Sequence, residues 1–382
     1  MKKKVGLITF HKSLNYGSAL QTWALSYILK SLNNDVKIID YTPKNYNDLY
    51  SLFWMPTSIR NINGNIMHLF WLPFLLRRKN SFYTFRNKFL PMSEKQYTTN
   101  DDISDFTNNI DVMICGSDQI WNPIAKDFDM NYLLYNINCK RKVSYAVSIG
   151  NSRLEDSDQT DEIKKGLMDY DNISMREESA AENVRALLDG HKEVEVVLDP
   201  TLLLRKNDFN QITYGKRIKE PYIFFYSVWY DASAINAVNE ISKKYGLPVY
   251  TLMSGRGNSL LLKNFKRIHF PNIDAGPSGF LSMIRNAEYV VTDSFHGTAF
   301  SIVFEKNFVT INDRKADGSL KNDERINNIL EKLDLSSNYI PSENVTSFNL
   351  EQDLDYKSIT KERLKLAKHS IDYLKRALEL EK

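Results

Sequence analysis

The stretch KVGLITFHKSLNYGSALQTWALSYILKSLNNDVKIIDY (4–41) decides the fold class of this chain. It opens with a short apolar run over residues 4–10 and ends with a second one, VKIIDY, over residues 36–41. Between the two runs, apolar side chains recur at helical spacing: Leu20, Trp23, Ala24, Tyr27 and Ile28. A strand, a helix and a second strand in this order predict a parallel βαβ unit.

The same alternation continues along the chain and predicts two sets of strands. In the first set we expect further strands at 111–116, 142–148, 172–175 and 194–200, and in the second set strands at 222–228, 247–252, 267–270, 287–293 and 307–312. A chain of 382 residues is long for a single core. We therefore predict an α/β protein with two doubly wound domains facing a cleft, over residues 1–200 and 201–350, and an amphipathic C-terminal helix over 351–382.

The composition is that of a globular protein and excludes several classes. The formal net charge is only +3, from 50 basic and 47 acidic residues, which argues against a nucleic-acid partner. The two cysteines, Cys115 and Cys139, are not in a CxxC pattern, so we expect neither a disulfide framework nor a zinc site. The first apolar run is too short for a signal peptide, so we expect a cytoplasmic protein. We also expect that it needs no metal or cofactor.

Two motifs carry polar residues directly after apolar strands. ICGSDQIWNP (114–123) delivers Ser117 and Asp118, and VVTDSFHGTAFSIVF (290–304) delivers Asp293, Ser294 and His296. Ligands of open α/β sheets bind beyond the carboxyl ends of the strands, so these side chains should meet in the cleft. Histidine suits proton transfer near neutral pH. The alternatives are a turn role for the aspartate and a structural role for the histidine.

Further residues could bind an anion or a sugar hydroxyl. Asn15, Tyr16, Gly17 and Ser18 precede the first helix, whose N-terminus favours an anion, although Asn15 or Ser18 could simply cap the helix. Arg176 follows a strand and suits a phosphate or carboxylate, unless it only pairs with Glu177 or Glu178. A basic loop supplies Arg314 and Lys315, with Arg325 behind it, and these charges either clamp an anion or meet water. Trp121 is either a sugar-stacking platform or a loop anchor.

Taken in order, six motifs resemble those of the polysaccharide pyruvyl transferases: NYGSALQTWAL, ICGSDQIWNP, VSYAVSIG, SMREESA, VVLDPTLLL and TDSFHGTAFSIVF. The resemblance extends from residue 1 to about residue 335. It implies two Rossmann-like halves, similar to the GT-B glycosyltransferases. It also implies transfer of the enolpyruvyl unit of phosphoenolpyruvate to a sugar diol as a cyclic ketal, in capsular polysaccharide or exopolysaccharide biosynthesis. The acceptor would be a lipid-linked or nucleotide-activated sugar.

The resemblance also assigns roles to residues of this chain. The family binds its donor through an Asp, an Arg and a His, which match Asp118, Arg176 and His296, with Asp118 and His296 as the catalytic pair. The family pattern R-[LI]-H-G reads Ser294-Phe295-His296-Gly297 here, so a serine stands where an arginine is usual. We expect the donor to meet Ser117, Arg176, Ser294, Phe295 and His296, with Arg314 or Lys315 supplying the missing charge.

Two questions stay open at the level of sequence. The aromatic and basic segment 65–90 is either a helix of the fold or a peripheral membrane contact, with Trp71, Phe74 and Leu75 in the interface and Arg77, Arg78 and Lys79 at headgroups. The chain could also be a GT-B glycosyltransferase that uses a nucleotide sugar, or a glycan-binding subunit without catalysis. A comparison of phosphoenolpyruvate binding with nucleotide-sugar binding distinguishes the pyruvyl transferase from the glycosyltransferase.

Overall fold

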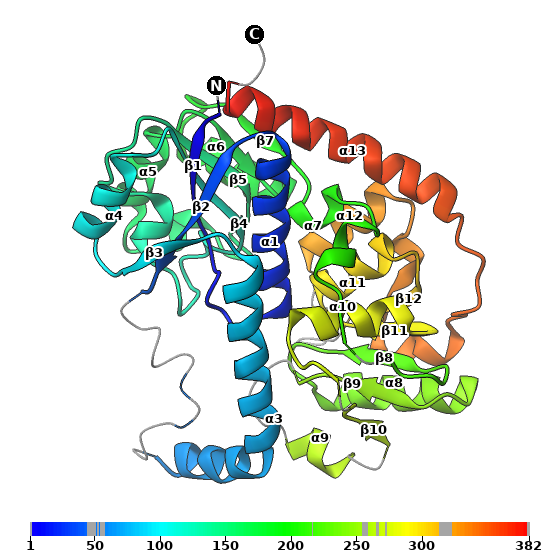
Figure 1. The fold of residues 1–382 in the computed structure, drawn as a ribbon. Coiled ribbons are helices and arrows are strands. Elements are labelled where there is room, and N and C mark those ends of the chain that lie inside the picture. The colour runs from blue at the N-terminus through cyan, green and yellow to red at the C-terminus, as the bar shows by residue number, and fades with distance from the viewer. Residues whose placement is uncertain are drawn as a thin grey trace.

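The computed structural model describes residues 2–43, 51, 53, 58–215, 217–253, 259–264, 267–271, 273–312 and 323–379. Over these residues the chain forms two parallel β-sheets flanked by helices, with a long C-terminal helix across the top of the molecule (Figure 1). The predicted α/β class with two doubly wound sheets is confirmed.

The first sheet has the strand order β3-β2-β1-β4-β5-β6-β7. Its strands are β1 (Lys4–Ile8), β2 (Asp35–Tyr41), β3 (Met92–Tyr97), β4 (Val112–Asp118), β5 (Lys142–Val147), β6 (Ile173–Met175) and β7 (Val194–Val196). The helices of this half are α1 (Tyr16–Ser31), α3 (Ile59–Phe89), α4 (Asn100–Thr107), α5 (Thr160–Met168) and α6 (Glu178–Leu187). Every side chain of β4 and β5 is buried, as expected for central parallel strands covered on both faces.

The second sheet has the order β10-β9-β8-β11-β12-β13. Its strands are β8 (Ile223–Tyr226), β9 (Val249–Thr251), β10 (Ile268–His269), β11 (Tyr289–Thr292), β12 (Asn307–Asn312) and β13 (Tyr339–Pro341). Its helices are α8 (Ala232–Tyr245), α9 (Ser259–Lys263), α10 (Pro277–Asn286), α11 (Phe295–Val303) and α12 (Glu324–Lys332). The short helix α7 (Pro200–Leu203) connects the halves, and α13 (Tyr356–Ala377) follows the second sheet.

The strand orders create one topological switch point in each sheet. The chain leaves β1 toward β2 on one side and later returns to β4 on the other side of β1. In the second sheet, β8 is flanked by β9 and β11 in the same way. Such points open a crevice at the carboxyl ends of the strands, and this is where ligands of doubly wound folds bind.

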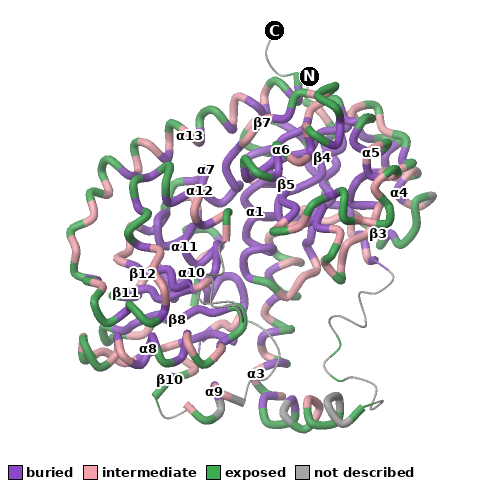
Figure 2. The backbone as a smooth tube through the Cα atoms, turned by 180° about the vertical axis from the view of Figure 1, so that it is seen from behind, coloured by how far each residue is buried: buried purple, intermediate pink, exposed green. Residues whose placement is uncertain are grey.

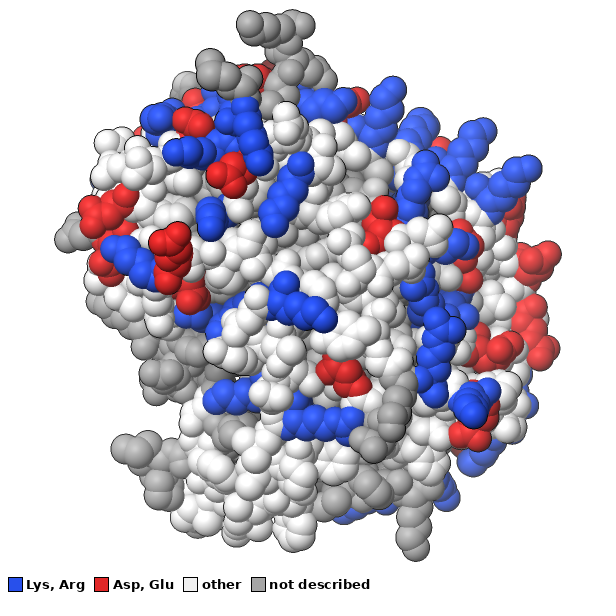
Figure 3. Space-filling view, in the orientation of Figure 1, with Lys and Arg blue, Asp and Glu red and all other residues white. Residues whose placement is uncertain are grey.

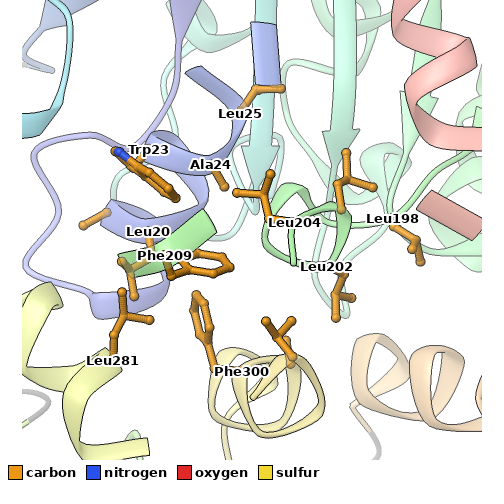
Figure 4. Close-up of a cluster of buried hydrophobic side chains, with 14 of the residues drawn as sticks. Leu20, Trp23, Ala24, Leu25, Leu198, Leu202, Leu204, Phe209, Leu281 and Phe300 are labelled. Atoms are coloured by element: carbon orange, nitrogen blue, oxygen red, sulfur yellow. The ribbon is translucent and has the colours of Figure 1, made fainter. Parts of the chain in front are cut away.

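A continuous apolar core joins the two halves of the molecule. Figure 4 shows Leu20 and Trp23 of α1 on one side, Leu281 of α10 and Phe300 of α11 on the other, and Phe209 between them. Phe209 contacts the rings of both Trp23 and Phe300, at centroid distances of 5.4 and 5.3 Å. In Figure 2 the segments around α1, α7 and α11 are accordingly coloured as buried. A shared core of this kind holds the two sheets in a fixed orientation.

Helix α13 returns from the second half and packs against the first. The Tyr373 hydroxyl donates to the carbonyl of Ser144 in β5, at 2.8 Å. The buried Arg363 guanidinium donates to the carbonyls of Leu202 and Leu204 beside α7. Ala367, Leu374 and Leu378 are buried, as expected for the apolar side of the predicted amphipathic helix. The helix therefore fixes the linker between the sheets.

Helix α3 corrects part of the prediction for residues 65–90. Trp71 and Leu75 are almost completely buried in the core of the second sheet, and Phe74 packs on Trp71 and Phe270. Arg78 is also buried and donates to the carbonyl of Leu14. The assignment of these side chains to a membrane surface was wrong, because the helix crosses between the two halves and uses them for packing.

Candidate active site

The two switch points bring their polar residues to one place between the sheets. Asn15–Ser18 follow β1 and open α1, and Ser117 and Asp118 end β4. From the second half, Ser294 and His296 follow β11 and open α11. A Cβ placed on Gly17 would lie 1.9 Å from His296 Nδ1. The absence of a side chain at Gly17 therefore lets the histidine of one half rest against the first helix of the other.

Arg176 is the centre of a buried cluster of charges. Its Nε donates to Glu177 Oε1 at 2.8 Å and its Nη1 donates to Asp199 Oδ2 at 3.0 Å. Its Nη2 lies 4.0 Å from Asp118 Oδ1. The side chains of Arg176, Glu177 and Asp199 are each less than 5% exposed. The predicted alternative, a pair between Arg176 and Glu177, is correct for one edge of the guanidinium, but the pair is buried and faces two further carboxylates.

Asp199, which the sequence analysis did not select, connects the arginine to the histidine. Its Oδ2 accepts from Arg176 and lies 3.7 Å from His296 Nε2, while its Oδ1 accepts from the amide and hydroxyl of Thr201. Asp199 lies in the motif VVLDPTLLL, where the proline that follows it opens α7. In the sequence, an acidic residue directly before a proline indicates only a helix N-cap. Asp199 does have this role, because its side chain accepts from the amide of Thr201.

Three buried polar atoms in this cluster have no hydrogen-bond partner among the described residues. They are Arg176 Nη2, Glu177 Oε2 and His296 Nε2. Buried polar groups in folded proteins are nearly always paired, so a group of unpaired atoms from both halves indicates where a polar ligand binds. Arg176 Nη2 lies 4.0 Å from Asp118 Oδ1, and His296 Nε2 lies 3.7 Å from Asp199 Oδ2. Both atoms are therefore in reach of a carboxylate without a hydrogen bond to it.

The charges fix one another's ionisation. Burial alone would raise the pKa of Asp199, but His296, Arg176 and the hydrogen bond from Thr201 hold that pKa well below its usual value. Burial would also raise the pKa of Asp118, which Arg176 and His296 instead keep below normal. For Glu177 burial prevails, and the pKa of this carboxyl is raised. The site therefore holds two firmly ionised carboxylates and a third that takes up a proton more readily.

A second cation enters the site from the other half. Arg325, at the start of α12, forms two hydrogen bonds to Asp323, and its guanidinium lies 6.0 Å from the centre of the Phe295 ring. Arg176 lies over the same ring at 4.6 Å. Phe295 is thus the aromatic partner of both guanidinium groups, one from each half of the protein.

The structure gives the remaining predicted residues different surroundings. Asn15 caps α1 by accepting from the amides of Gly17 and Ser18, so the capping alternative holds for its side chain. Tyr16 is fully buried, and its hydroxyl donates to the carbonyls of Met253 and Ala275 in the second half. We therefore assign Tyr16 to the contact between the halves rather than to the ligand loop.

The other residues near β4 divide into ligand-facing and structural groups. Ser18 donates to Asp118 Oδ2 at 2.6 Å and so orients this carboxylate. Ser117 is completely buried, and its hydroxyl donates to the carbonyl of Ala146 at 2.7 Å. Trp121 is also buried and donates to the carbonyl of Tyr132, which makes it a loop anchor.

Ser294 is buried and is the N-cap residue of α11, directly before Phe295. Arg314 and Lys315 lie outside the described residues. Asp293 accepts from the Ser227 hydroxyl and the Val228 amide, and burial raises its pKa to about 6. Among the residues that the structure describes, no group of three or more His, Cys, Asp and Glu side chains is arranged to hold a metal ion.

The architecture is shared with several solved structures. The chain superposes on a UDP-GlcNAc 2-epimerase described as putative from Listeria monocytogenes (TM-score 0.53, 13% identity, covering 100% of this chain and 98% of the other). It also superposes on the UDP-GlcNAc 2-epimerase from Methanocaldococcus jannaschii (TM-score 0.52, 14% identity, 97% and 99% covered). A third is AviGT4, a glycosyltransferase of avilamycin A biosynthesis (TM-score 0.50, 9% identity, 98% of each chain covered). At these identities the likeness shows the fold alone.

These similarities define the class of the protein as a two-domain, Rossmann-like fold of the GT-B type. No curated protein sequence matches the chain. The family model of the polysaccharide pyruvyl transferases matches residues 15–314, which include Asp118, Arg176, Asp199 and His296. The chain belongs to the polysaccharide pyruvyl transferase family and is a transferase.

Proposed function

We propose that this enzyme transfers the pyruvyl group of phosphoenolpyruvate to two hydroxyls of a sugar, forming a cyclic ketal. The observation that carries the proposal is the convergence of three unpaired buried atoms, Arg176 Nη2, Glu177 Oε2 and His296 Nε2, in a chain of this family. A small trianionic donor needs cations and hydrogen-bond donors in a site shielded from water. The described cluster offers both.

The proposed donor contacts use the two cations of the site. Arg176 Nη2 donates to the phosphate or carboxylate of phosphoenolpyruvate, and Arg325 provides a second positive charge from the opposite half. This charge stands near Phe295, beside the position where the family usually has an arginine and this chain has Ser294. The N-termini of α1, α6, α11 and α12 begin at residues of this cluster, and their dipoles favour a bound anion.

The chemistry then needs one mobile proton and one oriented hydroxyl. The first sugar hydroxyl attacks C2 of phosphoenolpyruvate, and C3 gains a proton and becomes a methyl group. The C2–O bond to phosphate breaks, and the second hydroxyl closes the ketal at C2 while its proton leaves with phosphate. We assign the proton transfer to His296, and we assign the orientation of the attacking hydroxyl to Asp118, which Ser18 holds in place.

Asp199 is a positioning residue in this scheme. It accepts from Arg176 and lies 3.7 Å from His296 Nε2, so it fixes the direction of the guanidinium relative to the imidazole. The acceptor remains a lipid-linked or nucleotide-activated sugar in our proposal, and the setting remains capsular polysaccharide or exopolysaccharide assembly in the cytoplasm. We propose no resident metal or cofactor and no nucleic-acid partner.

The proposal is tested by ligand-induced thermal stabilisation with phosphoenolpyruvate and with a panel of nucleotide sugars. A ligand at about 100 times its Kd stabilises the native state by about 2.7 kcal/mol. We expect such a shift for phosphoenolpyruvate with the wild type, and a smaller one with Arg325→Met. Arg285→Met is the matched control and should keep the full thermal shift. Arg285 lies in the same half as Arg325 but donates to the carbonyl of Lys206.

A shift with nucleotide sugars only would contradict the proposal and favour a GT-B glycosyltransferase. Equal shifts of the wild type and Arg325→Met with phosphoenolpyruvate would refute the cation assignment. If the donor binds and His296→Asn still releases phosphate at the wild-type rate in the presence of an acceptor, the proton-transfer role is wrong.

A further inference from the structure

Helix α3 exposes a continuous apolar face that the active site does not use. Twelve large hydrophobic side chains are exposed among the described residues, and six of them lie on this helix: Ile62, Ile66, Leu69, Phe70, Leu76 and Tyr83. The most exposed of the six is Phe70, at 65%. Ile66 follows Ile62 after four residues, and Leu69 and Phe70 follow Ile66 after three and four, so these four side chains share one side of the turns before Pro73. Isolated exposed hydrophobics are common, but a contiguous stripe marks an interaction surface.

The helix extends away from the body of the protein at this end. Figure 1 shows that the first turns of α3 run across the bottom of the view, and the remainder rises beside α1 and the second sheet. Pro73 lies inside the helix, and a proline removes a backbone hydrogen bond and bends the helix before it. Figure 2 shows the same end mainly in the colour of exposed residues. Trp71 and Leu75, by contrast, anchor the opposite side in the second half.

The charge of this element is entirely positive. Residues 59–89 contain six lysines and arginines and no aspartate or glutamate. Lys79 and Lys88 are exposed, and Arg77 and Arg86 are half-buried. In Figure 3 the described surface at the bottom of the view is white, and blue side chains lie above it. An apolar stripe bordered by basic side chains is the pattern of a helix that lies in the interface of an anionic membrane.

A cavity of about 450 Å³ lies next to this face. Lys12, Lys79 and Arg86 line it together with the rings of Phe82, Tyr83 and Phe85. Part of the charge of Lys12 is balanced by Asp40, at 2.7 Å. The cavity thus combines cations and aromatic rings in the second half of α3, and Tyr83 is the one exposed hydrophobic residue that the described part of this helix contributes to its lining.

We propose that the exposed face of α3 docks this enzyme onto an anionic phospholipid bilayer. Leu69, Phe70 and Ile66 enter the interface, and Lys79 and its basic neighbours contact phosphate headgroups. The apolar part of this face differs from the one that the sequence suggested, since Trp71 and Leu75 are buried, whereas Lys79 keeps its suggested place at the headgroups. Docking would hold the enzyme at the surface that carries a lipid-linked acceptor. The inference adds to the proposed function but does not depend on the donor, because vesicle binding is measured without phosphoenolpyruvate.

The test is co-flotation of the full chain with vesicles of phosphatidylcholine alone or mixed with phosphatidylglycerol. We expect binding to the mixed vesicles that weakens with salt. The double variant Leu69→Ser/Phe70→Ser should lower the partition coefficient at least about tenfold, because two apolar side chains lose their burial. Lys79→Gln should lower it about fivefold, the effect of one basic residue near an anionic surface. Ile124→Ser and Lys365→Gln, which change exposed residues elsewhere, should leave it unchanged.

Three results would overturn the docking proposal. These are absence of binding to mixed vesicles, equal binding of the wild type and the Leu69→Ser/Phe70→Ser variant, and a concentration-dependent dimer in sedimentation that this variant abolishes without any vesicle binding. The last result would assign the face to a second copy of the chain. The thermal shift with phosphoenolpyruvate, measured on the same variants, keeps the proposed function separate: it should equal that of the wild type whichever way the vesicle experiment falls.

Discussion

Replacing Arg176 by methionine removes a buried cation that lies within 4.0 Å of three carboxylates. The distances to Glu177, Asp199 and Asp118 are 2.8, 3.0 and 4.0 Å. At an effective dielectric constant of about 20, each attraction is on the order of 4–6 kcal/mol. Desolvation of the buried charges offsets most of this. The net loss expected when one partner of a buried pair is removed is about 3–5 kcal/mol.

The loss should depend on pH in a definite direction. Without the guanidinium, the pKa of Glu177, already raised by burial, should rise further, and that of Asp199 should no longer be held down. Carboxyls with a folded-state pKa above the unfolded value destabilise the fold as pH rises through that range. The deficit of Arg176→Met should therefore be larger at pH 8 than at pH 5. Adding Asp199→Asn to Arg176→Met should recover part of it.

Thermal and urea unfolding of the wild type and variants measure these differences. Arg185→Met is the matched control, because Arg185 forms an exposed pair with Glu178 in α6 and should cost less than about 1 kcal/mol. A loss for Arg176→Met as small as that of the control at pH 8 would refute the reasoning. So would a deficit that grows as the pH falls, because the cluster would then not be held together by ionised carboxylates.

Three further outcomes follow from the same geometry. Gly17→Ala should lower turnover about 100-fold by displacing His296, since displacements of about 1 Å have such effects. It should also cost about 1–3 kcal/mol of stability, because the added methyl group overpacks the buried contact. Gly166→Ala in α5, where the added Cβ meets only ordinary contacts, is its matched control. Asp293→Asn should stabilise the protein above pH 6, because burial raises the pKa of this carboxyl to about 6. The gain in unfolding free energy should stay below about 3 kcal/mol, since the carboxyl is partly exposed. It should vanish near pH 4, and unfolding measured at both pH values checks this. Trp71→Ala should cost about 3–5 kcal/mol in urea unfolding, whereas a cost below about 1 kcal/mol would show that α3 is not part of the core.

Most of the fold could be predicted because its central strands are apolar throughout. Two of the four edge strands, β3 and β13, could not. β3 (Met92–Tyr97) has a mostly polar and exposed sequence, and β13 (Tyr339–Pro341) has only three residues. Edge strands are buried on fewer sides, so they lack the apolar run by which a central strand is recognised. The sequence also could not predict which side of α3 packs against the protein, because apolar residues occur all around its middle turns. The tertiary structure alone selects Trp71 and Leu75 for burial.

The site was predictable where a residue stands at the end of an apolar strand. Asp118, Arg176 and His296 satisfy this rule and converge in the structure. Asp199 lies after the short strand β7, before a proline, and its pattern indicates only a helix cap. Arg325 opens α12, and its approach to the ring of Phe295 depends on how the two halves are oriented. Contacts that arise between domains leave no periodic signal in the sequence, so these partners required the structure.

The central claim is that phosphoenolpyruvate is the donor, and product analysis tests it most directly. The purified enzyme is incubated with ¹³C-labelled phosphoenolpyruvate and a pool of lipid-linked and nucleotide-activated sugars, and free phosphate and labelled sugar are measured together. The account predicts phosphate and a ¹³C-ketal sugar in equal amounts, both lost in His296→Asn. Release of a nucleoside diphosphate from a nucleotide sugar, with phosphoenolpyruvate unchanged, would contradict it.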